Sequence, residues 1–345
     1  MPRNPLSVDA YVNGILAGDR IVLGRAITLV ESSKPEHQAV AREVIGRLLE
    51  RPDKPADSYR IAITGSPGVG KSTFIEALGT YLVDQGERVA VLAIDPSSAV
   101  SGGSILGDKT RMEQLSVSER AFIRPSPSGD SLGGVARKTR ETILLVEAAG
   151  YTTVLLETVG VGQSEVAAHS MTDLFLLLLL PGAGDELQGI KRGIVEMADL
   201  LVVNKADNDR IALAKQAQAW YRNAIHLFPA QSSGWTPRVL TCSAQEKNGI
   251  DEVWVAAKAY RKLLTDNGGW TENRRRQAQY WLREALHEGL LRTFYNHPAV
   301  RQRLAALEPA VLEGRMSPFA AAEETLRNWT IDSIDSIGSI GSIER

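Results

Sequence analysis

The stretch "RIAITGSPGVGKST", residues 60–73, decides the fold. Its first six residues form a short apolar run of the kind that predicts a buried strand, and the residues from Lys71 onward have helical spacing. The loop between them matches G-x-x-x-x-G-K-[ST] in full, and it has the strand-to-helix context that this motif needs. The fixed positions are Gly65, Gly70, Lys71 and Ser72.

This loop is predicted to bind phosphate. Its glycines allow backbone N–H groups to curl around phosphate oxygens, and the helix N-terminus adds a field of roughly half a positive charge. We expect Lys71 to reach the β- and γ-phosphates and the Ser72 hydroxyl to bind Mg²⁺. The predicted phosphate-binding set is Gly65, Pro67, Gly68, Val69, Gly70, Lys71, Ser72 and Thr73.

Short apolar runs alternate with longer amphipathic runs from residue 60 to residue 244. Several are apolar at nearly every position, which is typical of strands buried on both faces of a parallel sheet. This alternation predicts an α/β fold with a doubly wound, mainly parallel sheet that binds ligands at the carboxyl ends of its strands. The later strand candidates are "RVAVLAID", "AFIRPSP", "TTVLLETVG", "LFLLLLLPG", "DLLVVNKAD" and "RVLTCSA".

The leucine-rich run at residues 174–180 is short for a membrane span. It holds seven apolar residues between Asp173 and Pro181, whereas a spanning helix needs about 20. We therefore predict a buried strand there and no membrane association. The first residues also lack the apolar core of a signal peptide.

Charge and cysteine content exclude further classes. The chain has 39 basic and 41 acidic residues, a net charge of −2, which argues against a broad nucleic-acid-binding face. Its one cysteine, Cys242, cannot form an internal disulfide. This usage is typical of a reducing compartment and predicts a cytoplasmic location.

Four segments are expected along the chain. The N-terminal segment is predicted to be helical, and Ser33, Pro35 and Glu36 indicate a capping box with proline in the first turn of a helix. The C-terminal segment is charged and helical; a helix packed on the core and an arm used in dimerisation remain open. The last segment is a Ser-Ile repeat, expected to be disordered or not native. The boundaries are 1–54 (helical), 55–265 (P-loop domain), 266–329 (helical arm) and 330–345 (tail).

A second motif, "NKAD", predicts which base is bound. Asn204, Lys205 and Asp207 directly follow an apolar strand. An aspartate accepts from the N1 and N2 donors of guanine, whereas adenine would leave that buried carboxylate unpaired. The next strand ends in Ser243 and Ala244, which we expect behind the base. The sequence therefore predicts GTP and GDP as ligands.

Carboxylates at strand ends are candidates for the magnesium site. Because Mg²⁺ takes few protein ligands and keeps several waters, Asp95, Asp108 and Glu157 are predicted to act with Ser72, directly or through water. Gly160 follows Glu157 as in Asp-x-x-Gly and is expected to sense the γ-phosphate. Gln163, Lys109, Arg111 and Lys191 are equal candidates for polarising the transition state. The predicted catalytic set is Lys71, Asp95, Asp108, Glu157, Gly160 and Gln163.

Together, "ITGSPGVGKST", "IDPSSAVSGGSILGDKTRM", "FIRPSPSGDSLGGVA", "ETVGVGQSE", "LLPGAGDELQGIK" and "VVNKAD" resemble the MeaB/ArgK family of P-loop GTPases, which includes a human methylmalonic aciduria type A protein. The resemblance covers roughly residues 7–329. It implies a homodimeric GTPase that acts as a chaperone for adenosylcobalamin-dependent methylmalonyl-CoA mutase, gates loading of its cofactor and protects it from inactivation. It also implies mobile loops at about 97–108, 160–165 and 182–191.

The polar segment after the leucine run is predicted to signal to the partner protein. Gly182 and Gly184 give it conformational freedom, and its polar residues could pair with other loops or with the partner. The alternative is a solvated connector. The predicted signalling residues are Asp185, Gln188 and Lys191.

Two other functions fit the sequence less well. A nickel-delivery GTPase is disfavoured because the ligand types that bind nickel are scarce: the five histidines are scattered and there is one cysteine. A kinase, the role implied by the arginine-transport name of some relatives, needs an acceptor pocket and a base that no motif supplies.

Overall fold

The computed structural model describes residues 6–51, 58–94, 112–125, 132–158, 164–182, 192–226, 228 and 233–327. The chain divides into two compact units, Met1–Ala278 and Gln279–Arg345, and each is described by itself. The first unit holds the whole sheet and the phosphate loop.

The sheet has seven strands in the order β3-β2-β4-β1-β5-β6-β7, and every neighbouring pair is parallel. The doubly wound parallel sheet expected from the sequence is therefore confirmed. Strand β1 lies between β4 and β5, so the carboxyl ends of these three strands meet at one edge, where such sheets bind ligands. The strands are β1 Tyr59–Gly65, β2 Val89–Ile94, β3 Ala121–Arg124, β4 Thr153–Thr158, β5 Leu174–Leu179, β6 Leu200–Val203 and β7 Arg238–Thr241.

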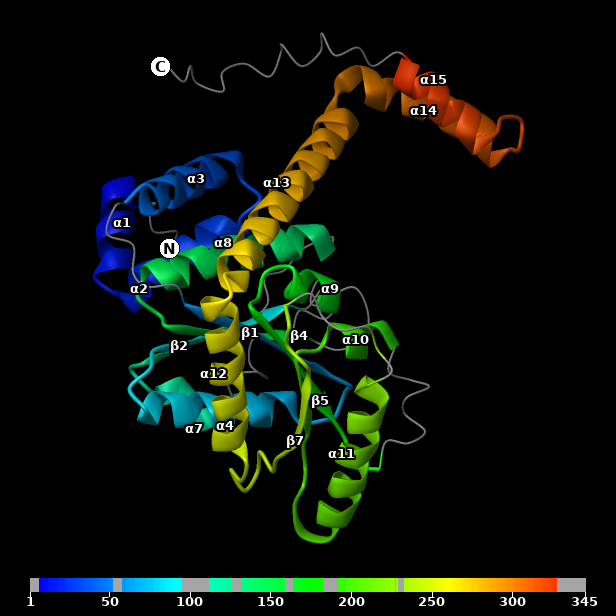
Figure 1. Cartoon of the computed structure of the whole chain (residues 1–345). Helices are drawn as coiled ribbons and strands as arrows, with labels where there is room; N and C mark the ends of the chain where they lie inside the picture. The colour runs from blue at the N-terminus through cyan, green and yellow to red at the C-terminus, as the bar shows by residue number, and fades with distance from the viewer. Residues whose placement is uncertain are drawn as a thin grey trace. The chain divides into compact units, whose positions relative to one another are not determined.

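Helices pack around the sheet, and two sets of them contact one another (Figure 1). In one group α4 contacts α7 and α12, and in the other α8 contacts α9 and the N-terminal helices. Helix α4 follows the phosphate loop directly. The bounds are α4 Lys71–Asp84, α7 Glu113–Val117, α8 Leu132–Ala148, α9 Ser164–His169, α10 Arg192–Met197, η2 Asn208–Arg210, α11 Ile211–Ile225 and α12 Ile250–Asp266.

The leucine run is the central strand β5. All six of its residues are buried, and it pairs with β1 on one side and β6 on the other. The prediction of a buried strand is confirmed. Among the described residues, no helix combines the length and the apolar character that a membrane crossing requires.

The N-terminal segment forms three helices, α1 Val8–Leu16, α2 Arg20–Glu31 and α3 Pro35–Leu49. The capping box predicted at Ser33 is wrong, because the N-cap of α3 is Lys34, whose side chain makes no capping bond. A residue before proline favours an extended backbone, and Lys34 has φ −73° and ψ 129°. The helix therefore starts one residue later, and Ser32 Oγ instead accepts from Lys34 N at 3.3 Å.

A buried ionic cluster ties the amino ends of β1 and β5 to the start of α13, Gly269–Asn296. Arg60 pairs with Glu147 of α8 at 2.6 Å, and Arg274 of α13 pairs with Asp173 at 2.6 Å. Asp173 also accepts from Arg60 N at 2.9 Å. Because each carboxylate faces more than one donor, the cost of burying these charges is offset within the cluster.

The described part of the second unit is helical. It holds the remainder of α13 with α14 Pro298–Leu312 and α15 Pro318–Arg327. Helices α14 and α15 contact each other, and Arg303 pairs with Glu324 between them.

We predict that Asp199, just before β6, makes stability depend on pH. It is buried and accepts from Phe175 N at 2.8 Å, and burial raises its pKa from 3.8 to about 7. A carboxyl whose pKa is higher in the folded protein stabilises the fold while protonated, and that stability is lost as pH rises through about 7. The unfolding free energy of the wild type should therefore fall by about 3 kcal/mol more between pH 5 and pH 8 than that of Asp199→Asn.

Urea unfolding at both pH values measures this difference. Asp84→Asn, an exposed residue at the end of α4, is the matched control. A wild type and an Asp199→Asn variant with parallel pH profiles would contradict the prediction.

Candidate nucleotide-binding site

The phosphate loop depends on glycines with left-handed backbone. Gly68 has φ +80° and Gly70 φ +94°, a region that other residues rarely adopt. A Cβ on Gly70 would also lie 2.8 Å from Asn204 Nδ2, whereas a Cβ on Gly68 would meet no atom within 4 Å. We define the base loop as residues 204–207 and 242–249. Gly70 therefore allows close contact between the phosphate loop and the base loop. Gly68 leaves the open side of the phosphate loop unobstructed.

Lys71 lies inside the phosphate loop. It is the first residue of α4 and is buried, and its Nζ donates to Gly65 O at 2.9 Å and to Ser66 O at 3.2 Å. Burial lowers the pKa of Lys71, and the negative charges of Glu157 and Glu165 oppose that shift. A cation held there by two carbonyls can interact with phosphate oxygens that approach the loop.

The Ser72 hydroxyl donates to Glu157 Oε1 at 3.0 Å. Glu157 is the second-to-last residue of β4. The hydroxyl of the next residue, Thr158, donates to Thr64 on β1 at 2.8 Å and so fixes the two strand ends together. A hydroxyl beside a carboxylate is the oxygen chemistry that Mg²⁺ prefers. Within the described residues no group of three or more His, Cys, Asp and Glu side chains could hold a metal ion.

Several predicted residues lie outside the part of the chain that the structure describes. They are Asp95, Asp108, Lys109, Arg111, Gly160, Gln163, Asp185, Gln188 and Lys191.

Asn204 connects the base loop to the phosphate loop. Its Nδ2 donates to Val69 O at 2.9 Å, and its Oδ1 accepts from Ala244 N at 3.1 Å. Cys242 Sγ also donates to this oxygen, at 3.5 Å. Asn204 is 1% exposed, so these bonds between the two loops lie away from water.

Asp207 is oriented for hydrogen bonding. Ser243 Oγ donates to its Oδ2 at 2.8 Å, and Arg210 pairs with its Oδ1 at 3.0 Å. Lys205 has φ +58°, and its Nζ donates to Gly68 O at 2.7 Å. The residues of both motifs thus lie in one continuous hydrogen-bonded site at the carboxyl ends of β1, β6 and β7.

The sequence predicts Ser243 and Ala244 behind the base, and the structure shows how each of them acts. In the structure Ser243 orients Asp207, and the Ala244 amide holds Asn204. Arg210 was not among the residues predicted from the sequence, although a spacing of three residues, as between Asp207 and Arg210, is a usual ion-pair spacing on a helix. Burial raises the pKa of Cys242 to about 12, so it stays a thiol that can donate to Asn204.

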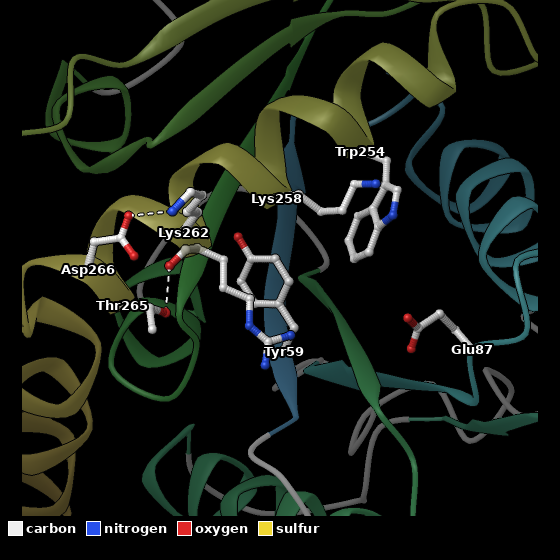
Figure 2. Close-up of a pocket in the computed structure, with 8 residues that line it drawn as sticks. Tyr59, Glu87, Trp254, Lys258, Lys262, Thr265 and Asp266 are labelled. Carbon is white, nitrogen blue, oxygen red and sulfur yellow. Dashed lines mark hydrogen bonds and ion pairs between the residues drawn. The ribbon is translucent and has the colours of Figure 1, made fainter.

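A hollow of about 340 Å³ lies at the opposite end of β1 from the phosphate loop (Figure 2). Its lining includes Tyr59, the first residue of β1, and side chains of α12. Two of its cations make contacts within the protein: Lys262 pairs with Asp266 at 2.7 Å, and Arg261 lies over the Tyr59 ring at 5.3 Å. This hollow is therefore separate from the nucleotide-binding site.

Comparison with known proteins agrees with this geometry. Residues 23–299 match the family described as methylmalonyl Co-A mutase-associated GTPase MeaB. A putative GTPase of Caulobacter vibrioides is 52% identical and covers 93% of this chain and 97% of its own. The mitochondrial methylmalonic aciduria type A homolog of Mus musculus is 44% identical over 93% of this chain and 79% of its own.

Two further relatives extend the comparison. GTPase ArgK of Escherichia coli is 44% identical over 90% of this chain and 95% of its own. A crystal structure named LAO/AO transport system kinase superposes with a TM-score of 0.73 and 36% identity, covering 95% of this chain and 99% of its own. Motifs, sheet topology and relatives agree, and the chain belongs to the MeaB family of P-loop GTPases.

Proposed function

We propose that this GTPase is a chaperone for adenosylcobalamin-dependent methylmalonyl-CoA mutase, gating the loading of the cofactor and protecting the mutase from inactivation. The observation that carries the proposal is the match of residues 23–299 to a family described as mutase-associated. The mouse relative, named for methylmalonic aciduria, supports it. A cytoplasmic location remains a prediction from the cysteine content.

We assign the chemistry of hydrolysis as follows. The phosphate loop and Lys71 hold the phosphates, and Asp207 with Lys205 recognises guanine. Mg²⁺, when bound by Ser72 with help from Glu157, Asp95 and Asp108, supplies positive charge for the phosphates. Because phosphoryl transfer is catalysed mainly by position and charge, an incomplete set of cations gives a slow intrinsic rate that a partner can raise.

We propose that the segment after β5 carries the signal to the partner. Strand β5 is buried on both faces and hydrogen-bonded to two neighbouring strands, so the position of its end at Leu179 is fixed. Residues 183–191 follow this strand in the chain. We expect the polar residues Asp185, Gln188 and Lys191 of that segment to form pairs that depend on the nucleotide. Nickel delivery gains no support, because the described residues hold no cluster of metal-binding side chains.

We also propose that the protein is a homodimer joined through α13. Leu282, Leu286 and Leu290 are 63%, 59% and 53% exposed, and their spacing of four residues places them in one stripe of the helix. Exposed leucines in a row favour a partner of the same apolar character, and a second copy of the helix provides one.

A kinase is the second candidate, because one similar solved structure is named a transport system kinase. The two functions differ in where the γ-phosphate goes. With γ-labelled GTP, release of all label as inorganic phosphate supports the GTPase chaperone, and label on a protein or small-molecule acceptor supports the kinase.

The first prediction from the proposed function concerns the base. An asparagine at position 207 would keep an acceptor for the N1 proton, which guanine and xanthine share, but its amide donor would face the 2-amino group of guanine, whereas xanthine offers a carbonyl acceptor at its C2 position. We expect Asp207→Asn to weaken GTP binding by at least about 100-fold and to improve binding of xanthosine triphosphate. Competition of both nucleotides against a fluorescent analogue measures this. Equal loss for both would mean that the substitution disrupts the loop instead.

The second prediction concerns the partner. Purified methylmalonyl-CoA mutase should raise GTP turnover and should load its cofactor differently when this protein and GTP are present. We expect Gln188→Ala and Lys191→Ala to keep basal hydrolysis largely intact and to lose the stimulation. Lys71→Ala, which lacks the phosphate-binding cation, should lose both.

Turnover is measured with and without the mutase, in its apo and cofactor-loaded forms. If the mutase changes neither turnover nor loading, the chaperone proposal fails. If Gln188→Ala and Lys191→Ala lose basal and stimulated activity equally, the segment belongs to the basic catalytic machinery.

The third prediction concerns the dimer. Leu286→Ser with Leu290→Ser should halve the mass measured by light scattering, because the apolar contact that joins two copies is removed. Glu284→Ala, on another side of the same helix, is the control and should keep the dimeric mass. A wild type that is already monomeric at micromolar concentration would refute the proposed dimer.

A further inference from the structure

We propose that the hollow at the amino end of β1 is a second binding site, and that it takes a small molecule in which a flat apolar group carries a carboxylate or a phosphate (Figure 2). The volume of the hollow, about 340 Å³, lies within the range of small-molecule sites. None of its lining residues belongs to a nucleotide motif, and the inference does not depend on the proposed function.

One side of α12 forms most of the lining. Trp254, Lys258 and Arg261 follow one another at spacings of four and three residues, which places them on the same side of the helix. Lys262 and Thr265 continue this side into the next turn. The helix therefore sets the positions of these side chains relative to one another.

Two aromatic rings form the apolar part of the lining. The ring centroids of Tyr59 and Trp254 are 6.0 Å apart, and both residues belong to the hydrophobic core. The Tyr59 hydroxyl donates to Ala257 O at 2.8 Å, which fixes this ring against α12. The rings thus keep their positions without a ligand, and aromatic surfaces of this kind favour a flat apolar group.

The charged part of the lining is mainly basic. Arg261 lies over the Tyr59 ring at 5.3 Å, so its charge is held beside the aromatic part. Lys262 pairs with Asp266 at 2.7 Å, and both side chains are more than half exposed, so this pair contributes little and exchanges readily with other partners. The basic side chains thus surround a site with an apolar floor.

Lys258 supplies the charge for a ligand. Among the described residues it has no hydrogen-bond or ion-pair partner, and Figure 2 shows its side chain extending toward Trp254. Glu87 lies apart from the lysines and accepts from the Thr152 hydroxyl. A carboxylate or phosphate beside Lys258 would pair with its ammonium while the apolar part of the ligand covers the Trp254 ring.

The test uses the full chain labelled with 5-fluorotryptophan, in saturating GDP and Mg²⁺ so that the nucleotide site is occupied. Four probes are titrated. Benzoate and phenyl phosphate carry a ring and a negative charge, acetate carries the charge alone, and benzyl alcohol carries the ring alone. The fluorine NMR signal of Trp254 is followed, and Trp254→Phe assigns it.

We expect benzoate and phenyl phosphate to shift the Trp254 signal with half-saturation near about 1 mM, because one ring and one exposed ion pair give weak binding. Acetate and benzyl alcohol should need at least about tenfold higher concentrations, because each lacks one of the two contacts. The tighter of the two ring-bearing probes shows whether a carboxylate or a phosphate is preferred.

The variants test the charge. Lys258→Gln should weaken the binding of benzoate about fivefold, and Lys258→Arg, which keeps the charge, should stay within about twofold of wild type. Lys215→Gln removes an exposed lysine from α11 and is the matched control, which should bind as the wild type does.

A Trp254 signal that no probe shifts would overturn the proposal, and so would equal affinity for benzoate in the wild type and Lys258→Gln. Binding of acetate or benzyl alcohol as tight as that of benzoate would overturn recognition by ring and charge together. If Trp254→Phe does not fold, Lys258→Gln and Lys258→Arg decide from the tryptophan signal that benzoate shifts. A Trp254 signal that responds to protein concentration and to none of the probes would mean that a second copy of the chain fills the hollow, and would also overturn the proposal.

Discussion

The site depends on the side chain of Asn204, which joins two loops that are about 130 residues apart in the sequence. Its amide donates to Val69 O in the phosphate loop and accepts from Ala244 N in the base loop. An amide can fill both roles because it carries a donor and an acceptor on one rigid plane. With Asn204 1% exposed, these bonds form away from water, where an unpaired polar group would be costly.

The sheet brings the two loops to where Asn204 can join them. Parallel pairing of β1 with β5, and of β5 with β6, places the ends of these strands at one edge. The buried leucines of β5 stabilise this arrangement without making specific polar contacts, and the ionic cluster at the other end fixes β1 and β5 to α13. Apolar burial thus positions the strands, and hydrogen bonds at their carboxyl ends set how the phosphate loop and the base loop lie against each other.

Glu76 and Lys247 extend the same design to α7. Each places a charged group on an atom of Gln114 or its neighbour, and each comes from an element that carries a nucleotide motif. The start of α7 is therefore connected to both nucleotide-motif elements by side chains that no motif names. Connecting residues such as Glu76 and Lys247 have no fixed spacing from the motifs, so the motif pattern does not reveal them.

The sequence by itself determined the strands, their parallel arrangement and the phosphate loop, because apolar periodicity and the G-x-x-x-x-G-K-[ST] spacing are local properties of the chain. It missed the start of α3, where the proline at position 35 moved the helix N-cap to Lys34. Only the tertiary structure decided that Ser243 orients Asp207, that Ala244 holds Asn204 and that Glu76 caps α7. These contacts join residues distant in sequence, and their partners are chosen by how the strands and helices pack in three dimensions.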